Sequence, residues 1–283
     1  MNPILVTGAR GQVGVEVCEK LLILGYKVIA CGHSDLDITS ENEVSSLFES
    51  TPISLVINCA AYTAVDKAED EEKAAYAVNA LGPKYLAQEC KLRDIPLIHI
   101  STDYVFDGKG HKPYTPEDET KPISVYGKTK RAGELAVLNN AREAVVIRTA
   151  WLYSPYGNNF VKTMRRLGNE KETINVVSDQ IGTPTYAGDL AEAIVKIIPQ
   201  ISEKTKGVYH FTNEGVCSWY DFANEIMEQS HLACQVNPIP STAYPTRATR
   251  PFYSVLDKSK TKTTFNISIQ HWKKGLEKCL QRF

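Results

Sequence analysis

The sequence lacks the features that mark several classes of protein. None of its seven cysteines forms a CxxC pair, so neither a zinc site nor a disulfide framework is indicated. Reduced thiols are typical of the cytoplasm, where we expect this protein to act. No apolar run approaches the length of a membrane span, and there is no signal-peptide pattern. A formal net charge of -1 gives no electrostatic reason to expect binding to nucleic acid or to an anionic membrane.

Short apolar runs alternate with helix-like stretches through the first half of the sequence. The runs are almost continuously apolar, as in a parallel sheet that helices cover on both faces. This alternation predicts an α/β fold with a doubly wound parallel sheet. The predicted strands are residues 4–6, 28–31, 55–59, 97–101, 145–148 and 208–212. The predicted helices are residues 13–24, 41–49, 71–93, 126–139, 187–198, 219–229 and 269–280. Ser40 and Glu43 are spaced as a capping box for the second helix.

A glycine-rich loop, Gly8-Ala9-Arg10-Gly11-Gln12-Val13-Gly14, lies between the first predicted strand and the first predicted helix. Its GxxGxxG spacing is a variant of the dinucleotide-binding fingerprint, in which glycines permit a tight turn and a close approach of the backbone to a pyrophosphate. The amino end of the helix adds free N–H groups and a positive dipole end. We therefore expect a Rossmann-type site. The residues expected at the cofactor are Gly8, Arg10, Gly11, Gln12, Val13 and Gly14.

The end of the second predicted strand bears on the choice of cofactor. It carries no acidic residue before Asp35, whereas an NAD-specific site normally places one there to hold the ribose diol. Arg10 is suited to a 2′-phosphate, with a solvated loop arginine as the alternative. Both observations favour NADPH and leave NADH open.

Past Trp151 the alternation gives way to loops at 153–159 and 178–188 and to a proline-rich stretch at 238–251. We predict a smaller C-terminal α/β lobe that binds the substrate across the carboxyl edge of the sheet. The predicted division assigns residues 1–150 and 187–213 to the dinucleotide-binding domain. It assigns residues 151–186 and 214–283 to the substrate lobe.

Tyr126 and Lys130 are the candidate catalytic pair. Four residues apart in a helix, they lie on one face, where we expect the ammonium to lower the pKa of the phenol. Thr102 ends the fourth predicted strand at the carboxyl edge, where open sheets bind ligands. Its hydroxyl is placed to hydrogen-bond a substrate carbonyl oxygen, and Tyr126 to protonate it. Together with the glycine loop, this set predicts a ketone reductase that uses a nicotinamide cofactor.

These elements together resemble the extended short-chain dehydrogenase/reductase family, and more narrowly the dTDP-4-dehydrorhamnose reductases. The likeness covers essentially the whole chain. It is carried by Asn58-Cys59-Ala60-Ala61-Tyr62-Thr63-Ala64-Val65-Asp66-Lys67-Ala68-Glu69, Ser101-Thr102-Asp103-Tyr104-Val105-Phe106, Val125-Tyr126-Gly127-Lys128-Thr129-Lys130, Arg148-Thr149-Ala150-Trp151, Gly157-Asn158-Asn159-Phe160, Asp179-Gln180-Ile181-Gly182-Thr183-Pro184-Thr185 and Arg250-Pro251.

The resemblance implies reduction of the 4-keto group of a dTDP-6-deoxyhexulose to dTDP-L-rhamnose. It places Gly11, Gln12 and Val13 at the pyrophosphate, Asp37 and Ile38 near the adenine, and Ala60, Ala61, Tyr62 and Thr63 along the cofactor. It makes Tyr126 and Lys130 catalytic. It places Thr102, Asp103, Tyr104 and Trp151 at the sugar, with Asn159 and Arg250 as candidates for nucleotide contacts. Core packing is the alternative for Trp151, and capping or surface ion pairing is the alternative for the last two.

Two other functions share this fold. One is an NADP-binding regulatory subunit of the kind that partners methionine adenosyltransferase; an intact Thr102, Tyr126 and Lys130 argue against a purely binding role. The other is a sugar-nucleotide epimerase or 4,6-dehydratase. Dehydratases of this type typically carry Asp-Glu after the threonine, whereas Thr102 is followed by Asp103-Tyr104.

Some relatives are described as magnesium-dependent dimers held together by clustered acidic side chains. Glu16 is the candidate ligand in this sequence, and one carboxylate is a poor cage for Mg²⁺. The sequence therefore supports no metal site, and a requirement for Mg²⁺ is left open. The expected partner is a dTDP-sugar substrate, and the expected state is a monomer or a homodimer.

Overall fold

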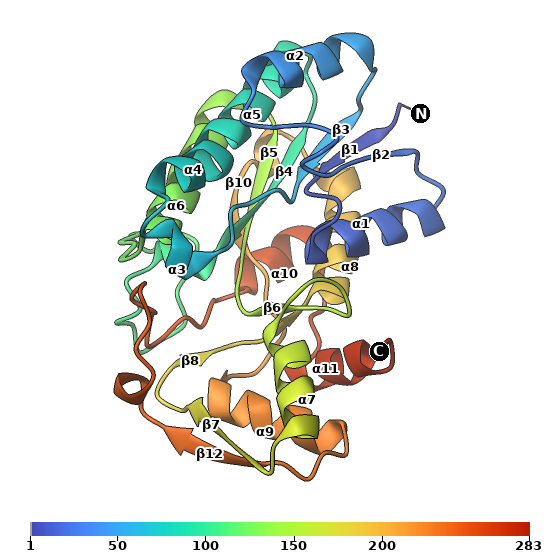
Figure 1. The fold of residues 1–283 in the computed structure, drawn as a ribbon. Helices are drawn as coiled ribbons and strands as arrows, with labels where there is room; N and C mark the ends of the chain where they lie inside the picture. Colours follow the sequence, from blue (N-terminus) through green and yellow to red (C-terminus); the bar gives the residue numbers. More distant parts are fainter. Residues whose placement is uncertain (1) are drawn as a thin grey trace.

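A six-stranded parallel sheet is the centre of the computed structural model, which describes residues 2–283 (Figure 1). In sheet order the strands are β10 (Gly207–His210), β5 (Ala144–Thr149), β4 (Leu97–Thr102), β3 (Leu55–Asn58), β1 (Ile4–Thr7) and β2 (Val28–Cys31). The direction of strand addition reverses between β1 and β3, so the helices that follow these two strands diverge to opposite faces. This opens a crevice at the carboxyl edge.

Helices cover both faces of the sheet, which explains the continuous apolar runs. Ile4 and Val6 pack with α1 (Gln12–Ile23) and α8 (Ala187–Ile197), whereas Leu5 packs on the opposite side. The helices of that side are α2 (Glu41–Ser50), α5 (Gly82–Leu92) and α6 (Val125–Asn140). The predicted doubly wound α/β fold is confirmed.

The long helix predicted over 71–93 is interrupted. It consists of α4 (Glu72–Tyr76), a π-helical turn (Ala77–Leu81) and α5, and the short helix α3 (Val65–Ala68) precedes it. The wider turn brings Asn79 inward. Its amide oxygen accepts from the Tyr62 N–H at 2.9 Å, and its amide nitrogen donates to the Tyr62 carbonyl oxygen at 3.2 Å. Asn79 thus fixes the loop that follows β3. Such π-turns inside helices are frequent at functional sites.

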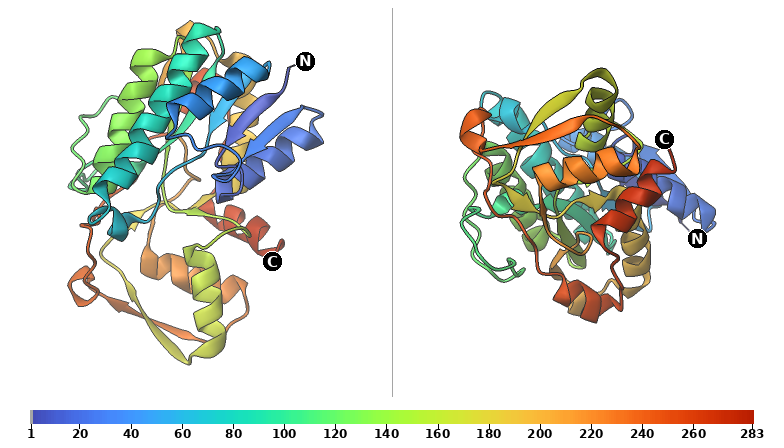
Figure 2. Two further views of the ribbon diagram at one scale, coloured as in Figure 1. Left: turned by 45° about the horizontal axis from the view of Figure 1, so that its top comes forward. Right: turned by 90° about the horizontal axis from the view of Figure 1, so that it is seen from below.

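A second apolar core lies beyond the carboxyl end of the sheet (Figures 1 and 2). It is built mainly by α7 (Phe160–Glu170), α9 (Trp219–Gln229), α11 (Trp272–Leu280) and the paired strands β7 (Thr173–Val177) and β12 (Gln235–Ile239). Two short strand pairs join it, β6 (Leu152–Tyr153) with β9 (Thr185–Tyr186) and β8 (Ile181–Gly182) with β11 (Cys217–Ser218). The predicted smaller α/β lobe is therefore present.

The domain boundaries stay a prediction, and one segment crosses them. Helix α10 (Ser259–Phe265) belongs to the range assigned to the substrate lobe, but Phe265 and Ile267 pack in the core under the sheet.

The capping box at α2 is half formed: Ser40 accepts from the Glu43 N–H, while the Glu43 carboxylate accepts from the backbone of Asp37 instead. None of the helices within residues 2–283 is long and apolar enough to cross a bilayer.

A buried ion pair fixes α6 against the sheet. The carboxylate of Glu134, on α6, accepts two hydrogen bonds from the guanidinium of Arg148 at 2.8 and 2.9 Å and one from the Ser101 hydroxyl at 2.6 Å. Arg148 and Ser101 lie near the ends of β5 and β4. Because buried charges need such partners, the pair fixes the position of α6 along these strands.

Replacing one partner of this pair is expected to destabilise the fold strongly. Arg148→Met leaves the Glu134 carboxylate buried without its main partner, so the free energy of unfolding in urea should fall by about 3 kcal/mol or more. Arg142→Met is the matched control, since that arginine is 60 % exposed and its ion pairs should contribute under about 1 kcal/mol. Equal losses in the two variants would contradict this account.

Candidate active site

A cavity of about 760 Å³ lies at the carboxyl edge of the sheet. Its walls come from the glycine loop, the ends of β2 to β5, the first turns of α6 and the loop after β6. The predicted site residues that line it are Gly8, Arg10, Gly11, Gln12, Val13, Asp37, Ile38, Ala60, Ala61, Tyr62, Thr63, Thr102, Asp103, Tyr104, Tyr126, Lys130 and Trp151. Three predicted residues, Gly14, Asn159 and Arg250, do not line it.

The glycine loop is held close to the end of β3. Gly8 has φ +64°, and a Cβ there would lie 2.5 Å from the backbone nitrogen of Ala60. A Cβ on Gly14 would lie 2.2 Å from the Gly8 carbonyl oxygen, so Gly14 serves the packing of the loop on α1 and not the cavity wall. Gly11 is the N-cap of α1 and has no capping side chain, which leaves the N–H groups of the first turn available for an anion.

Arg10, in the glycine loop, packs beside the end of β2 and lies on the rim of the cavity. Its aliphatic part packs on Gly32, where a Cβ would lie 2.9 Å from the arginine Cδ. Its guanidinium pairs with Asp35 at 3.1 Å, and the same carboxylate accepts from the Gly32 N–H at 2.8 Å. Asp35 therefore orients Arg10. Asp37, further along, accepts from the backbone N–H and hydroxyl of Thr39, which holds the pKa of its carboxyl below the ordinary value.

A chain of buried polar groups joins three strand ends beneath the cavity. The Asn58 amide oxygen accepts from the Thr7 hydroxyl at 2.8 Å and from the Ala60 N–H at 3.1 Å. The Asn58 amide nitrogen lies 3.1 Å from Nδ1 of His99, so β1, β3 and β4 are connected. Burial, together with nearby Lys130, holds the pKa of His99 well below its ordinary value. Sequence reasoning missed Asn58, His99 and Asn79 as positioning residues; the signal was a polar residue inside an apolar run.

Thr102 and Tyr126 approach each other because of local capping. Thr102 ends β4, where its hydroxyl accepts from the Tyr104 N–H at 3.2 Å and donates to Asp103 at 3.0 Å. Ser124 caps α6 by accepting from the Gly127 N–H at 3.1 Å, which places Tyr126 in the first turn. A Cβ on Gly127 would lie 2.2 Å from the Tyr104 carbonyl oxygen, so glycine lets this turn press against the end of β4.

The electrostatics of the catalytic pair differ from the expectation. Lys130 is 2 % exposed, its ammonium donates to the Ile100 carbonyl at 2.6 Å, and burial lowers its pKa to about 8. Tyr126 keeps part of its surface open to the cavity, yet desolvation raises the pKa of its phenol above the ordinary value. The predicted lowering of this pKa by Lys130 is therefore wrong, because desolvation dominates and the ammonium is bound elsewhere. The phenol is protonated at neutral pH and suited to donate a proton.

Comparison with known proteins agrees with this geometry. A family model described as the RmlD substrate binding domain matches residues 1–283. A dTDP-4-dehydrorhamnose reductase from Aggregatibacter actinomycetemcomitans is 42 % identical, covering 98 % of each chain. The spore coat polysaccharide biosynthesis protein SpsK of Bacillus subtilis is 41 % identical, covering 99 % of this chain and 98 % of that one. A crystal structure of dTDP-4-dehydrorhamnose reductase from Bacillus anthracis in complex with NADP has a TM-score of 0.96 at 38 % identity, covering 100 % of this chain and 99 % of that one.

This chain belongs to the RmlD family. The resemblance drawn from the sequence motifs is thereby confirmed.

Within this family member, Trp151 forms one wall of the cavity in an unusual backbone conformation. Its φ is +48°, in the left-handed region, and its indole stacks on Trp219 with ring centres 3.5 Å apart. Gly182 leaves room for the ring, since a Cβ there would lie 2.6 Å from Trp151 Cε2. A bulky residue held at positive φ is strained, and such residues cluster at functional sites.

Asn159 and Arg250 make structural contacts outside the cavity. Asn159 caps α7 by accepting from the Lys162 N–H at 3.1 Å. Arg250 pairs with Asp66 at 2.7 Å, and its second nitrogen lies 3.5 Å from the Tyr104 hydroxyl. Asn159 therefore acts as a cap and Arg250 as an ion-pair partner in the free protein, and their contacts to a nucleotide stay a prediction.

Glu16 does not fit a magnesium site. Both of its carboxylate oxygens accept hydrogen bonds from Arg282, at 2.7 and 2.8 Å. Among residues 2–283, no group of three or more His, Cys, Asp or Glu side chains is placed to hold a metal ion. The Arg282 guanidinium already supplies the positive charge beside Glu16.

Burial of Asp103 predicts a dependence of stability on pH. Desolvation raises the pKa of its carboxyl to about 6, so the stability that it contributes is present below about pH 4 and is lost as the pH rises through 6. The free energy of unfolding of Asp103→Asn minus that of wild type should therefore rise between about pH 4 and pH 7. We expect a rise of about 1 to 3 kcal/mol in urea unfolding.

Asp107→Asn is the matched control for this measurement. Hydrogen bonds from Lys109 and Tyr114 to Asp107 lower the pKa of its carboxyl, so its pH trend should have the opposite sign. The same trend in both variants would refute the assignment to Asp103.

Proposed function

We propose that this protein reduces the 4-keto group of dTDP-4-dehydro-6-deoxy-L-mannose (dTDP-4-dehydrorhamnose) to give dTDP-L-rhamnose, with NADPH as the reductant. One observation carries the proposal: Thr102, Tyr126 and Lys130 line the same cavity as the glycine loop. The names of the full-length relatives support the sugar, and the NADP complex of the Bacillus anthracis relative supports the cofactor.

The glycine loop and the end of β2 would hold the cofactor. Gly8 and Gly11 have no side chains to cover the backbone N–H groups at the amino end of α1, and such exposed N–H groups suit a pyrophosphate. Arg10 on the rim, oriented by Asp35, suits a 2′-phosphate. NADPH, when bound, would supply a hydride to the carbonyl carbon of the sugar.

The residues of the chain supply the proton. The Tyr126 phenol, protonated at neutral pH, transfers its proton to the C4 oxygen as the hydride reaches C4, and the phenolate is reprotonated from solvent. The Thr102 hydroxyl, which donates to Asp103 in the free protein, would turn its one proton to the same oxygen. One donor of Lys130 is used by the Ile100 carbonyl, and the remaining donors are suited to ribose hydroxyls and to the transient phenolate. This geometry is suited to stabilising the negative charge that develops on oxygen.

The remaining site assignments are part of the same proposal. Asp103, Tyr104 and Trp151 face the sugar, and Asn159 and Arg250 are the candidates for contacts to the nucleotide. Residues 1–150 with 187–213 bind the cofactor, and residues 151–186 with 214–283 bind the sugar nucleotide. The protein acts in the cytoplasm as a monomer or a homodimer.

Removal of the phenolic hydroxyl tests the catalytic assignment. Tyr126→Phe should lower kcat by about 100-fold or more, the usual effect of losing a general acid, and leave the Kd for NADPH within about threefold. The assay follows NADPH absorbance with dTDP-4-dehydrorhamnose and identifies the product. Tyr76→Phe, exposed and outside the cavity, is the control.

Activity near wild type in Tyr126→Phe would refute the role of the phenol. NADPH binding by wild type without oxidation by any dTDP-4-keto sugar would favour the regulatory-subunit alternative.

Arg10 is expected to determine the preference for NADPH. Arg10→Met removes a charge-assisted contact to the 2′-phosphate, so the KM for NADPH should rise by about tenfold while the KM for NADH changes little. Lys27→Met controls for net charge, since Lys27 precedes β2 at the opposite end from Gly32. A parallel rise for both cofactors would exclude this role for Arg10.

A further inference from the structure

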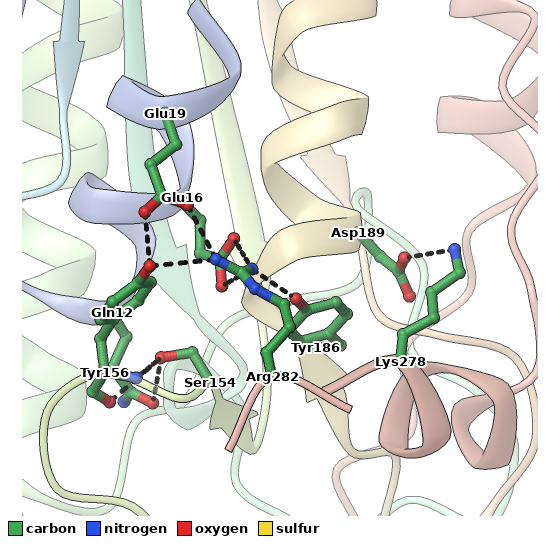
Figure 3. Close-up of polar contacts among 9 residues, drawn as sticks. All are labelled: Gln12, Glu16, Glu19, Ser154, Tyr156, Tyr186, Asp189, Lys278 and Arg282. Carbon is green, nitrogen blue, oxygen red and sulfur yellow. Dashed lines mark hydrogen bonds and ion pairs between the residues drawn. The ribbon is translucent and has the colours of Figure 1, made fainter. Parts of the chain in front are cut away.

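One face of α1 turns away from the sheet and meets distant parts of the chain. Gln12, Glu16 and Glu19 follow the helical spacing that places side chains on one face. Gln12 lines the cavity, so the face begins at the proposed pyrophosphate site. Figure 3 shows the side chains beside this face: Ser154 and Tyr156 of the loop after β6, Tyr186 at the end of β9, and Arg282 after α11.

Arg282 is the centre of this cluster. One terminal nitrogen donates to both oxygens of Glu16, at 2.7 and 2.8 Å, and to the Tyr186 hydroxyl at 2.7 Å. The other donates to Glu19 at 2.8 Å and to the Tyr156 hydroxyl at 3.0 Å. Glu16 is only 1 % exposed, so its charge depends on this guanidinium.

The loop of residues 154–158 is tied to the same face at two points. At its base, Gln12 accepts from Asn159 at 3.0 Å and from the Ser154 hydroxyl at 3.4 Å. At its side, the Tyr156 hydroxyl donates to Glu19 and accepts from Arg282. Gly157, at φ +61°, lies so near that a Cβ would be 3.3 Å from Gln12 Cγ. Gly157 and Asn158 line the cavity, so this anchoring fixes part of its wall.

We propose that Arg282 is a positioning residue for the NADPH site. It holds the 154–158 loop through Tyr156, and it neutralises two carboxylates that lie one and two turns behind the helix end facing the pyrophosphate. Without it, the Glu19 carboxylate opposes the phosphates, Glu16 loses the partner that keeps it ionised, and the loop loses its lateral anchor. It also supplies internally the positive charge that a divalent cation would otherwise bring to Glu16. The inference rests on the proposed use of NADPH.

The test measures NADPH binding to the full chain without sugar, by fluorescence titration. Arg282→Met should raise the Kd for NADPH by about tenfold, with kcat at saturating NADPH within about threefold of wild type. Arg282→Lys keeps the charge but loses the second terminal nitrogen of the guanidinium, so it should give an intermediate Kd for NADPH. A loss of packing alone would not produce this division between Kd and kcat. A Kd within about twofold of wild type in Arg282→Met would overturn the proposal.

Lys278→Met is the matched control. Lys278 is also basic, lies on α11 and pairs at 3.3 Å with Asp189, whose other hydrogen bonds come from Asn213 and Gln270 (Figure 3). Its Kd for NADPH should stay within about twofold of wild type. A rise equal to that of Arg282→Met would overturn the assignment to Arg282.

Tyr156→Phe keeps the proposal testable if Arg282→Met fails to fold. It removes one hydroxyl and leaves the bonds between Arg282 and Glu16, so the midpoint of thermal unfolding should hold while the Kd rises by about threefold. An unchanged Kd would count against the loop anchor.

Magnesium provides an independent comparison. EDTA and added MgCl₂ should leave the wild-type Kd unchanged, and a Kd that rises in EDTA would overturn the role of Arg282 as the internal cation. Because no sugar is present, failure of the proposed reductase reaction would not affect these binding measurements.

Discussion

The polar face of α6 is the constraint on which the site depends. Tyr126, Lys130 and Glu134 lie one turn apart, and the latter two are buried charges that bind the sheet. Lys130 donates to the carbonyl of Ile100, and Glu134 binds Arg148 and Ser101. Buried charges are costly unless such partners are met, so the helix has one favourable position along β4 and β5. That position places Tyr126 beside Thr102 at the carboxyl edge.

The same burial sets the chemistry of the pair. Desolvation disfavours the charged form of every group, so it raises the pKa of Tyr126 and lowers that of Lys130 to about 8. The site therefore holds a neutral phenol that can donate a proton and a lysine that exchanges protons near neutral pH. A carbonyl that accepts a hydride needs such a donor, whereas a preformed phenolate would be suited to the reverse reaction.

The sequence predicted the elements whose signals are local. The six strands follow from apolar runs, the phosphate loop from glycine spacing, and α6 from its capping serine and polar face. Contacts between distant residues carried no such signal. The π-turn at Asn79, the strained Trp151 and the Arg282 cluster join segments far apart in the chain. Asn159 and Arg250 are expected at the ligand from motif resemblance; their polar groups bind neighbouring side chains in the free protein, so that contact stays a prediction.

The transfer of hydride to C4 of the sugar is the central claim, and isotope transfer tests it most directly. The protein is incubated with dTDP-4-dehydrorhamnose and NADPH carrying deuterium at nicotinamide C4, and the product is examined by NMR. The account predicts dTDP-L-rhamnose with deuterium at C4 when the transferred face carries the label, and consumption of NADPH and ketone in equal amounts. Product without deuterium at C4 from either labelled face, or no oxidation of NADPH, would contradict it.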